Sequence, residues 1–181
     1  MNQDKLSQTR QLTLSALLLA IALVAQIIGR NFPDFSRLFV GPIVNAVLFI
    51  AAALCPLIYA VIIGCLTPVL ALVIGQLKAP LAPMIPFIIV SNIILVLIFS
   101  RAEDKLVSRG IWAVIASVAK YLFFLLTTNV LLSSFGISFP EKIMQKLPVA
   151  FGTTQLIAAL IGAVIAILCL ERIPFHKLGK E

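Results

Sequence analysis

Charged residues are scarce in this sequence, at 12% of 181 residues, whereas 61% are hydrophobic. Soluble domains carry about 25% charged and 45–50% apolar residues. A water-soluble core of this length does not need so much apolar sequence, and the mean hydropathy of +1.14 agrees. The scarcity of charge excludes a soluble domain and predicts an integral membrane protein. Its net charge of +7 then reflects the basic bias of membrane-protein loops, and we expect no nucleic-acid partner.

Residue types that carry catalysis or bind metals are also scarce. The only histidine is His176, in the charged C-terminal stretch, and no acidic residue lies inside an apolar run. The motifs H-E-x-x-H, G-x-S-x-G and G-x-x-x-x-G-K-[ST] do not occur. Cys55, Cys65 and Cys169 lie in apolar runs without C-x-x-C spacing, which favours small buried hydrophobes over disulfides or metal ligands. We therefore predict no catalytic residue, no metal and no cofactor, and we exclude an enzyme and a self-powered nucleotide pump.

Long apolar runs dominate what remains. A spanning helix needs roughly 20 apolar residues, fewer where it is short or broken. The first run is too long for a signal-peptide core and lacks a cleavage site, so it counts as a membrane helix. The chain is predicted to be one all-α domain, 1–181, a bundle of six transmembrane helices over Leu12–Gly29, Leu38–Cys55, Leu57–Gly75, Met84–Ser100, Ile111–Phe135 and Val149–Leu170.

Prolines mark the breaks between and within these helices. Cys55 and Pro56 alone separate the second and third helices, which predicts a tight hairpin. Pro68 lies inside the third helix, where it removes a backbone donor and should cause a kink, with neighbours satisfying the freed carbonyl. The connection QLKAPLAPMIP is predicted to be a stiff extended loop, and SFPEKIMQKLP a short amphipathic turn.

Loop charges predict the orientation. If both termini lie on one side, that side holds eight basic residues and the other side five: Lys5, Arg10, Arg101, Lys105, Arg109, Arg172, Lys177 and Lys180 against Arg30, Arg37, Lys78, Lys142 and Lys146. Basic residues favour the cytoplasmic side, which places both termini in the cytoplasm. Arg30, Arg37 and Lys78 are interpreted as solvated loop charges, although the sequence leaves open whether any joins a pocket.

Polar side chains within the predicted helices gather toward the outer side. Asn92 is mid-helix, Asn45 and Gln26 lie toward outer helix ends, and Thr127 and Thr128 lie in the outer half of the fifth helix. Thr153, Thr154 and Gln155 open the sixth helix, where Gln155 lies over Ala158, Ala159 and Gly162, a face that must meet another helix. Such asymmetry predicts a pocket reached from outside. Asparagine, glutamine and threonine also serve as contacts between helices, which is the alternative for each.

Lys120 is the one charge near the middle of a predicted span. A lysine at this depth costs about 2.5–3.5 kcal/mol on insertion scales and usually faces a cavity or a partner. Phe124 and Thr127 share its helix face, whereas Asn129 points away and is expected to bond a neighbouring helix. The counter-charge can be backbone carbonyls, a substrate anion or a loop acid such as Asp34. Snorkelling to the interface is the rival interpretation, made awkward by the mid-helix position.

Ala16 and Ala20 form a small-x-x-x-small pair on the inner half of the first helix. With six helices, cytoplasmic termini, a short hairpin and outer polarity, the chain resembles the substrate-binding S component of an energy-coupling factor (ECF) vitamin transporter. The resemblance implies a bacterial plasma-membrane protein that binds a vitamin or related micronutrient near its outer face. It also implies docking, through Ala16 and Ala20, on a transmembrane coupling subunit with two cytoplasmic ATPases.

The predicted substrate-binding residues are Lys120, Asn92, Thr127, Asn45, Gln155, Thr154 and Phe124. Lys120 favours a substrate with an anionic group, but the residues do not identify the compound. Two other functions stay open: a self-sufficient small permease or exporter acting as an oligomer, and a noncatalytic assembly protein. The permease would need a coupling-ion site, and no intramembrane acid is available for one; the assembly protein leaves Lys120 unexplained.

Overall fold

The computed structural model describes residues 2–32, 39–131, 139 and 147–172. Six α-helices occur within this part: α1 (Asn2–Asn31), α3 (Gly41–Leu54), α4 (Leu57–Val73), α5 (Ile85–Phe99), α6 (Leu106–Leu126) and α9 (Thr154–Arg172). Short helical segments precede α5, follow α6 and precede α9, namely η2 (Ala79–Met84), η3 (Thr127–Leu131) and η4 (Val149–Thr153). The described residues form no strand, and the predicted all-α fold of six helices is confirmed.

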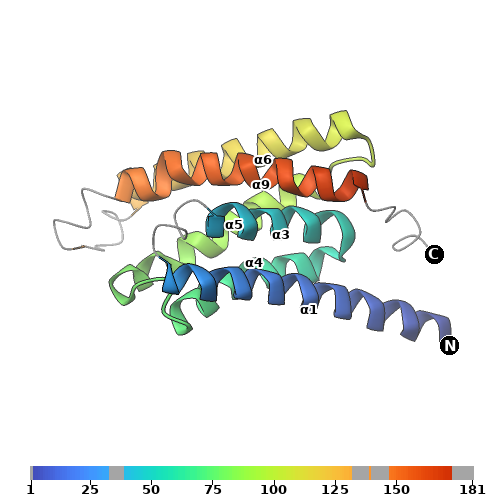
Figure 1. Ribbon diagram of the computed structural model, residues 1–181. Coiled ribbons are helices and arrows are strands. Elements are labelled where there is room, and N and C mark those ends of the chain that lie inside the picture. Colours follow the sequence, from blue (N-terminus) through green and yellow to red (C-terminus); the bar gives the residue numbers. More distant parts are fainter. Residues whose placement is uncertain (1, 33–38, 132–138, 140–146, 173–181) are drawn as a thin grey trace.

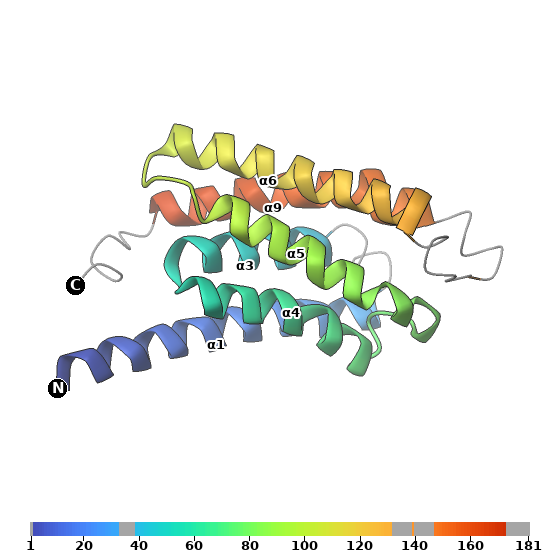
Figure 2. The same ribbon diagram turned by 180° about the vertical axis from the view of Figure 1, so that it is seen from behind.

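The helices lie in three layers (Figures 1 and 2). α6 and α9 form one outer layer, α3 and α5 the middle one, and α1 and α4 the other outer layer. The contacts agree, because α3 packs on α9, α5 packs on both α6 and α4, and α1 packs on α4 and α3. α1 begins and α9 ends at the same end of the bundle, called here the terminal end. Which side of a membrane this end faces remains a prediction.

The helix lengths suit a membrane. Four segments are long and apolar enough to cross one: Gln8–Asn31, Ala79–Phe99, Leu106–Val130 and Phe151–Arg172. α3 and α4 are shorter apolar helices of 14 and 17 residues, joined through Cys55 and Pro56 as the predicted hairpin. Only 28–33% of the residues in the four long windows are buried, so most of their apolar side chains face outward.

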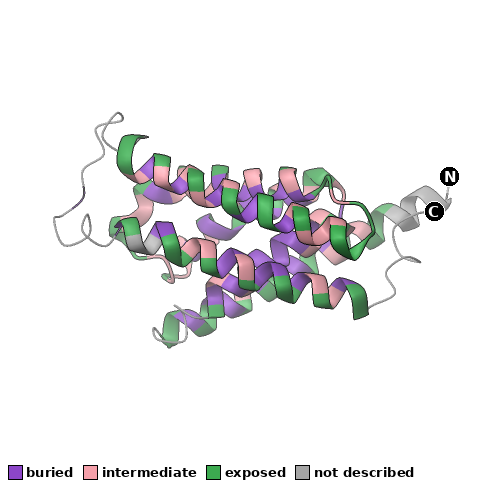
Figure 3. Cartoon of the chain, turned by 90° about the horizontal axis from the view of Figure 1, so that it is seen from above, coloured by how far each residue is buried: buried purple, intermediate pink, exposed green. Residues whose placement is uncertain are grey.

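The outward faces of the helices carry large apolar side chains. Exposed residues lie along the outer sides of the helices and buried ones face the interior (Figure 3). Large aliphatic side chains are exposed on every layer, among them Val24 of α1, Ile58 of α4 and Leu168 of α9. Exposed apolar surface on this scale is typical of a membrane protein, in which lipid is the solvent. The main interior cluster joins α1, α3, α4, α5, α6 and α9 and includes Phe49 stacked edge-on against Phe99, with ring centroids 4.8 Å apart.

The helix boundaries differ from the predicted spans where polar residues continue a helix. α1 begins at Asn2 rather than Leu12, and α6 begins at Leu106 rather than Ile111, because hydropathy marks the apolar stretch and not the helix end. α6 gives way to the wider turn of η3 at Thr127. α4 continues through Pro68 to Val73; the predicted kink stays a prediction. Leu38, residues 132–135 and most of SFPEKIMQKLP lie outside the described residues.

The predicted extended loop before α5 was wrong. Ala79–Met84 forms the 3-10 helix η2, with proline at its first turn and Pro83 inside it. Proline fixes φ near −65°, which a 3-10 helix also requires, and its missing N–H is not needed in a first turn. Clustered prolines therefore shaped a tight helix instead of an extended strand-like segment.

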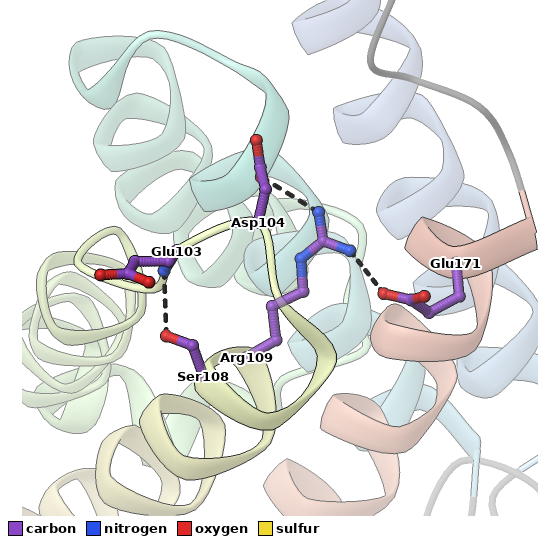
Figure 4. Close-up of polar contacts among 5 residues, drawn as sticks. All are labelled: Glu103, Asp104, Ser108, Arg109 and Glu171. Atoms are coloured by element: carbon purple, nitrogen blue, oxygen red, sulfur yellow. Dashed lines mark hydrogen bonds and ion pairs between the residues drawn. The ribbon is translucent and has the colours of Figure 1, made fainter.

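Arg109 ties the layer of α6 and α9 together at the terminal end (Figure 4). Its guanidinium donates to Glu171 Oε1 of α9 at 2.8 Å and to Asp104 Oδ1 before α6 at 3.1 Å. The hydroxyl of Ser108 accepts from the Glu103 backbone N–H at 3.0 Å in the same turn. The Arg109 side chain is 13% exposed, against 54% and 43% for the two carboxylates. One mostly buried arginine thus pairs with two acidic residues where the charged loop meets the bundle.

Candidate functional site

Lys120 lies in the middle of α6 and is buried, with only 3% of its surface exposed. Its ammonium group donates to two side-chain amide oxygens, Asn45 Oδ1 at 2.7 Å and Asn92 Oδ1 at 2.8 Å. Asn45 comes from α3 and Asn92 from α5, the two helices of the middle layer, and both are 2% exposed. Three of the seven predicted substrate-binding residues, Lys120, Asn45 and Asn92, therefore form a single contact cluster, called here the lysine site.

Neutral acceptors, rather than a charge, hold the ammonium in place. The predicted options for its partner were backbone carbonyls, a substrate anion or a loop acid; Asp34 lies outside the described residues. Two carboxamides were not among them. An ammonium group has three donors, and the described residues accept two of these. The described salt bridges all lie at the terminal end of the bundle, so the Lys120 amino group has no described counter-ion.

Each amide is oriented by what its nitrogen contacts. Asn45 Nδ2 donates to the Gly41 carbonyl one turn earlier in α3 at 2.9 Å. Asn92 Nδ2 donates across the bundle to the Gly64 carbonyl of α4 at 3.0 Å. A carbonyl can only accept and an ammonium can only donate, so each amide must turn its oxygen to Lys120. The amide oxygens are thereby aimed at the lysine before any ligand arrives.

The polar contacts continue into the third layer. Thr67 Oγ1 lies 3.5 Å from Asn92 Nδ2, and the Thr67 carbonyl accepts from Gln26 Nε2 of α1 at 3.2 Å. All of these side chains are buried. Gln26 Oε1 is the one buried side-chain polar atom of the described residues that finds no partner. A chain of contacts thus joins Gln26, Thr67, Asn92 and Lys120, from α1 to α6.

A close crossing of α3 and α9 brings Asn45 inward. A Cβ placed on Gly162 would lie 2.7 Å from the Pro42 carbonyl oxygen, 2.8 Å from Asn45 Cβ and 2.9 Å from the Ala46 nitrogen. Ala158, Ala159 and Ala163 are buried along the same side of α9. The predicted contact face of α9 is confirmed, and it packs on α3.

An apolar cluster lies beyond Lys120 along α6, away from the terminal end. It consists of Met84, Phe124, Phe139, Leu147 and Phe151, with Leu81, Phe87 and Ile88 packed against it, and is called here the aromatic cluster. The rings of Phe124 and Phe151 are tilted, with centroids 5.5 Å apart. Phe124 follows Lys120 by one helical turn, as predicted, and is 1% exposed. Thr127 follows by two turns, is fully buried, and donates to the Phe123 carbonyl at 2.9 Å.

Other predicted site residues lie apart from this group. Thr154 is exposed and Gln155 half-buried at the start of α9, and the described hydrogen bonds of the lysine site include neither. Asn129 was expected to bond a neighbouring helix; this was wrong, because its exposed side chain donates to the Leu125 carbonyl of its own helix at 2.8 Å. Local bonds to the preceding turn are common for asparagine, and they compete with contacts across helices.

The basic residues predicted for the outer loops have separate positions. Arg30 is exposed and donates to the Ile74 carbonyl at the end of α4 at 2.8 Å. Its guanidinium lies against Gly75, whose φ of 77° is left-handed and terminates the helix. Lys78 is exposed, and Arg37 lies outside the described residues.

Ala16 and Ala20 are both exposed on α1, so a partner helix has access to them.

The three cysteines are free, and the described residues contain no group of three or more histidine, cysteine or acidic side chains that could hold a metal.

Sequence reasoning missed the role of Thr67 and of the Gly64 carbonyl. The available signal was Pro68, because a proline inside a helix leaves the carbonyl four residues earlier without its helical donor. Sequence reasoning expected a neighbour to satisfy such a carbonyl without naming it, and Asn92 does so.

Comparison with known proteins assigns the chain to a family. The family described as ECF transporter, substrate-specific component, matches residues 10–174. No curated protein and no solved structure matches. The match spans nearly the whole chain and includes all six helices from residue 10 onward. The chain therefore belongs to the substrate-specific components of ECF transporters, and it is a multi-pass membrane protein that serves transport.

Proposed function

We propose that this chain captures a small, vitamin-like molecule with an anionic group from outside a bacterial plasma membrane. It then delivers that molecule through a separate coupling subunit driven by two ATPases. The family supports a substrate-specific transport component. The substrate class is argued from the lysine site, and the partner surface from α1.

The observation that carries the proposal is the pair of neutral acceptors on Lys120, at 2.7 and 2.8 Å. A buried charge is stabilised most by an opposite charge, and neutral amides compensate it only in part. A ligand carboxylate or comparable anion that accepts the third ammonium donor would complete the site. Asn45 and Asn92 hold the ammonium ready for it, which lowers the ordering cost of binding.

The aromatic cluster indicates the character of the rest of the ligand. Aromatic and aliphatic side chains of η2, α5, α6 and η4 meet around Phe124, one helical turn from Lys120. Ligand sites are mostly apolar with a few placed polar groups. We infer that Phe124 and its neighbours contact an apolar or flat body while Lys120 takes the anion. Thr127 lies on the same helix face, beyond Phe124, and is assigned to the same pocket, whereas Thr154 and Gln155 are assigned to its entrance.

The direct test measures binding to the purified protein. Native mass spectrometry first asks whether a small molecule is retained. Thermal shift then compares nicotinate, pantothenate and biotin with uncharged amides of the same body, such as nicotinamide. We expect a carboxylate, and not its amide, to bind. Lys120→Met should weaken that binding by about 2–5 kcal/mol, because a buried ion pair is lost.

Lys78→Met is the matched control, since this exposed lysine is not part of the lysine site and its loss should leave affinity unchanged. Equal affinity in Lys120→Met and the unaltered protein would refute the anion site. Failure to co-purify with ATPase and coupling subunits would favour the self-sufficient permease instead.

A further inference from the structure

Pro68 creates the acceptor that Asn92 uses. In an α-helix each backbone N–H bonds the carbonyl four residues earlier, so residue 68 would normally bond Gly64. Proline has no N–H, and α4 continues through it. The Gly64 carbonyl is therefore left without its helical donor at a buried position, since Gly64 and Pro68 are both buried.

Two side chains approach this open carbonyl. Asn92 Nδ2 of α5 donates to it at 3.0 Å, and Thr67 Oγ1 lies at 3.4 Å. The Asn92 bond is the shorter one and comes from a different helix. Asn92 Oδ1 simultaneously accepts from Lys120 at 2.8 Å. One carboxamide thus joins the open carbonyl of α4 to the amino group of Lys120 on α6.

The open Gly64 carbonyl determines which end of the Asn92 amide faces the lysine. With the nitrogen held on Gly64, the oxygen must point to Lys120, which only donates. The opposite orientation would leave both the carbonyl and the ammonium facing the wrong partner. α4 and α5 are closely packed here, because a Cβ at Gly64 would lie 3.4 Å from Asn92 Cβ, which is already van der Waals contact.

We propose that Pro68 is a positioning residue for the lysine site: by leaving the Gly64 carbonyl free, it locks the Asn92 amide with its oxygen on Lys120. The role concerns the ligand-free protein, and only its effect on binding rests on the proposed function. A helix-breaking residue that lowers local helix stability would then improve the preorganisation of the site.

Pro68→Ala restores the helical N–H at this position. The Gly64 carbonyl then bonds residue 68 within α4, and Asn92 is no longer needed there. The helix itself should be at least as stable, because alanine is the best helix former and proline the worst. What should weaken is the contact between Asn92 and Lys120, because the amide becomes free to turn.

The test is a set of thermal unfolding measurements on the full-length, ligand-free protein in lipid nanodiscs. Asn92→Leu, Lys120→Met and the double variant are compared with Pro68 present and again with Pro68→Ala. Contacting residues show non-additive effects on stability, whereas distant independent ones add. With Pro68 present, the double variant should lose less than the sum of the single losses, by about 2–4 °C in melting temperature.

With Pro68→Ala, that non-additivity should fall to less than half. Unchanged non-additivity in both backgrounds would overturn the proposal, as would its absence when Pro68 is present. A general packing role of Pro68 would lower every melting temperature equally and leave the coupling intact. Pro86→Ala is the matched control, since this exposed proline lies in the first turn of α5, where no helical donor is required.

Binding separates this inference from the proposed function. For the carboxylate probe that binds the unaltered protein, Pro68→Ala should raise the Kd about tenfold, equivalent to about 1.4 kcal/mol. In the Asn92→Leu background the same change should have no further effect. If the coupling depends on Pro68 but Lys120→Met binds the probes normally, the positioning role stands and the anion site fails.

Discussion

At the scale of single residues, the unusual feature is a buried ammonium between two carboxamides of α3 and α5. Intramembrane ionisable residues usually face a partner or a water-filled cavity and mark functional sites. Here the partners supply dipoles and no charge. Under the proposed function the site would therefore discriminate by charge: an arriving anion would gain the full interaction, while a neutral analogue would gain only one more hydrogen bond. Providing a counter-charge within the protein should remove this selectivity.

Asn45→Asp makes that test. Its carboxylate would lie where Asn45 Oδ1 now lies, 2.7 Å from Lys120 Nζ, and would compete with any ligand anion. Affinity for the carboxylate probe should fall at least tenfold, or about 1.4 kcal/mol, while the protein stays folded. Asn129→Asp introduces the same charge at an exposed position and should leave binding unchanged. Binding that survives Asn45→Asp would show that the ligand does not depend on the free charge of Lys120.

At the scale of elements, the crossing of α3 and α9 sets where Asn45 can reach. Small residues at such crossings let backbones approach closely, and close packing replaces the hydrophobic effect as the source of association in lipid. Gly162 faces backbone atoms of Pro42 and Ala46, which cannot move aside as a flexible side chain would. Any added atom at this position must separate the two helices, and Asn45 moves with α3.

Gly162→Ala should therefore both destabilise the bundle and weaken binding. The new Cβ would come within 2.7 Å of the Pro42 carbonyl oxygen, and overpacking of this kind typically costs about 1–3 kcal/mol. The same substitution at Gly110, where a Cβ would meet nothing within 4 Å, should be neutral or stabilising by up to about 1 kcal/mol. Thermal unfolding and probe affinity report the two effects. Gly162→Ala with unchanged affinity would mean that Asn45 does not depend on this crossing.

At the scale of the whole molecule, the residues proposed for binding and those proposed for coupling lie in different parts of the bundle. The lysine site lies within the bundle, in contact with α3, α5 and α6, whereas Ala16 and Ala20 are exposed on α1 in the opposite outer layer. Nucleotide hydrolysis is assigned to partner subunits under the proposed function. Damage to the α1 surface should thus separate transport from binding.

Ala16→Trp and Ala20→Trp make the distinction. Each indole would project from the exposed side of α1, so folding and probe affinity should be unchanged, while uptake by cells that supply the coupling subunit and ATPases should be abolished. Val114→Trp places the same bulk on an exposed position of α6 and should transport normally. Normal uptake by both alanine variants would exclude this surface as the docking site.

Periodicity and composition predicted the six helices, the hairpin at Pro56 and the burial of the face that carries Lys120, Phe124 and Thr127. They did so because these features depend on one helix and its solvent. The Asn45 and Asn92 contacts depend on how three helices are rotated about their axes, which no single helix encodes. The same limit explains the error at Asn129, whose side chain bonds a carbonyl of its own helix and not a neighbouring helix.

Pro68 could be interpreted only in part from the sequence. A proline at this position predicts that the Gly64 carbonyl lacks its helical donor, but only the packing of α5 on α4 shows that Asn92 is the donor that replaces it. The prediction for the proline-rich segment before α5 was wrong for a different reason. Proline restricts φ to values that both extended and 3-10 backbones accept, so composition alone could not distinguish the two.

The short α4 has a consequence for the surrounding lipid. Its 17 residues give a length of about 26 Å at 1.5 Å per residue, less than the hydrocarbon thickness of about 30 Å. Leu57, Ile58, Leu66 and Val73 are exposed along it, so acyl chains beside α4 must shorten, at a fraction of a kcal/mol per Å of mismatch. α1 packs next to α4 in the same layer. A protein that covers this flank would release the compressed lipid, and hydrophobic mismatch would thus favour association on the side that carries Ala16 and Ala20.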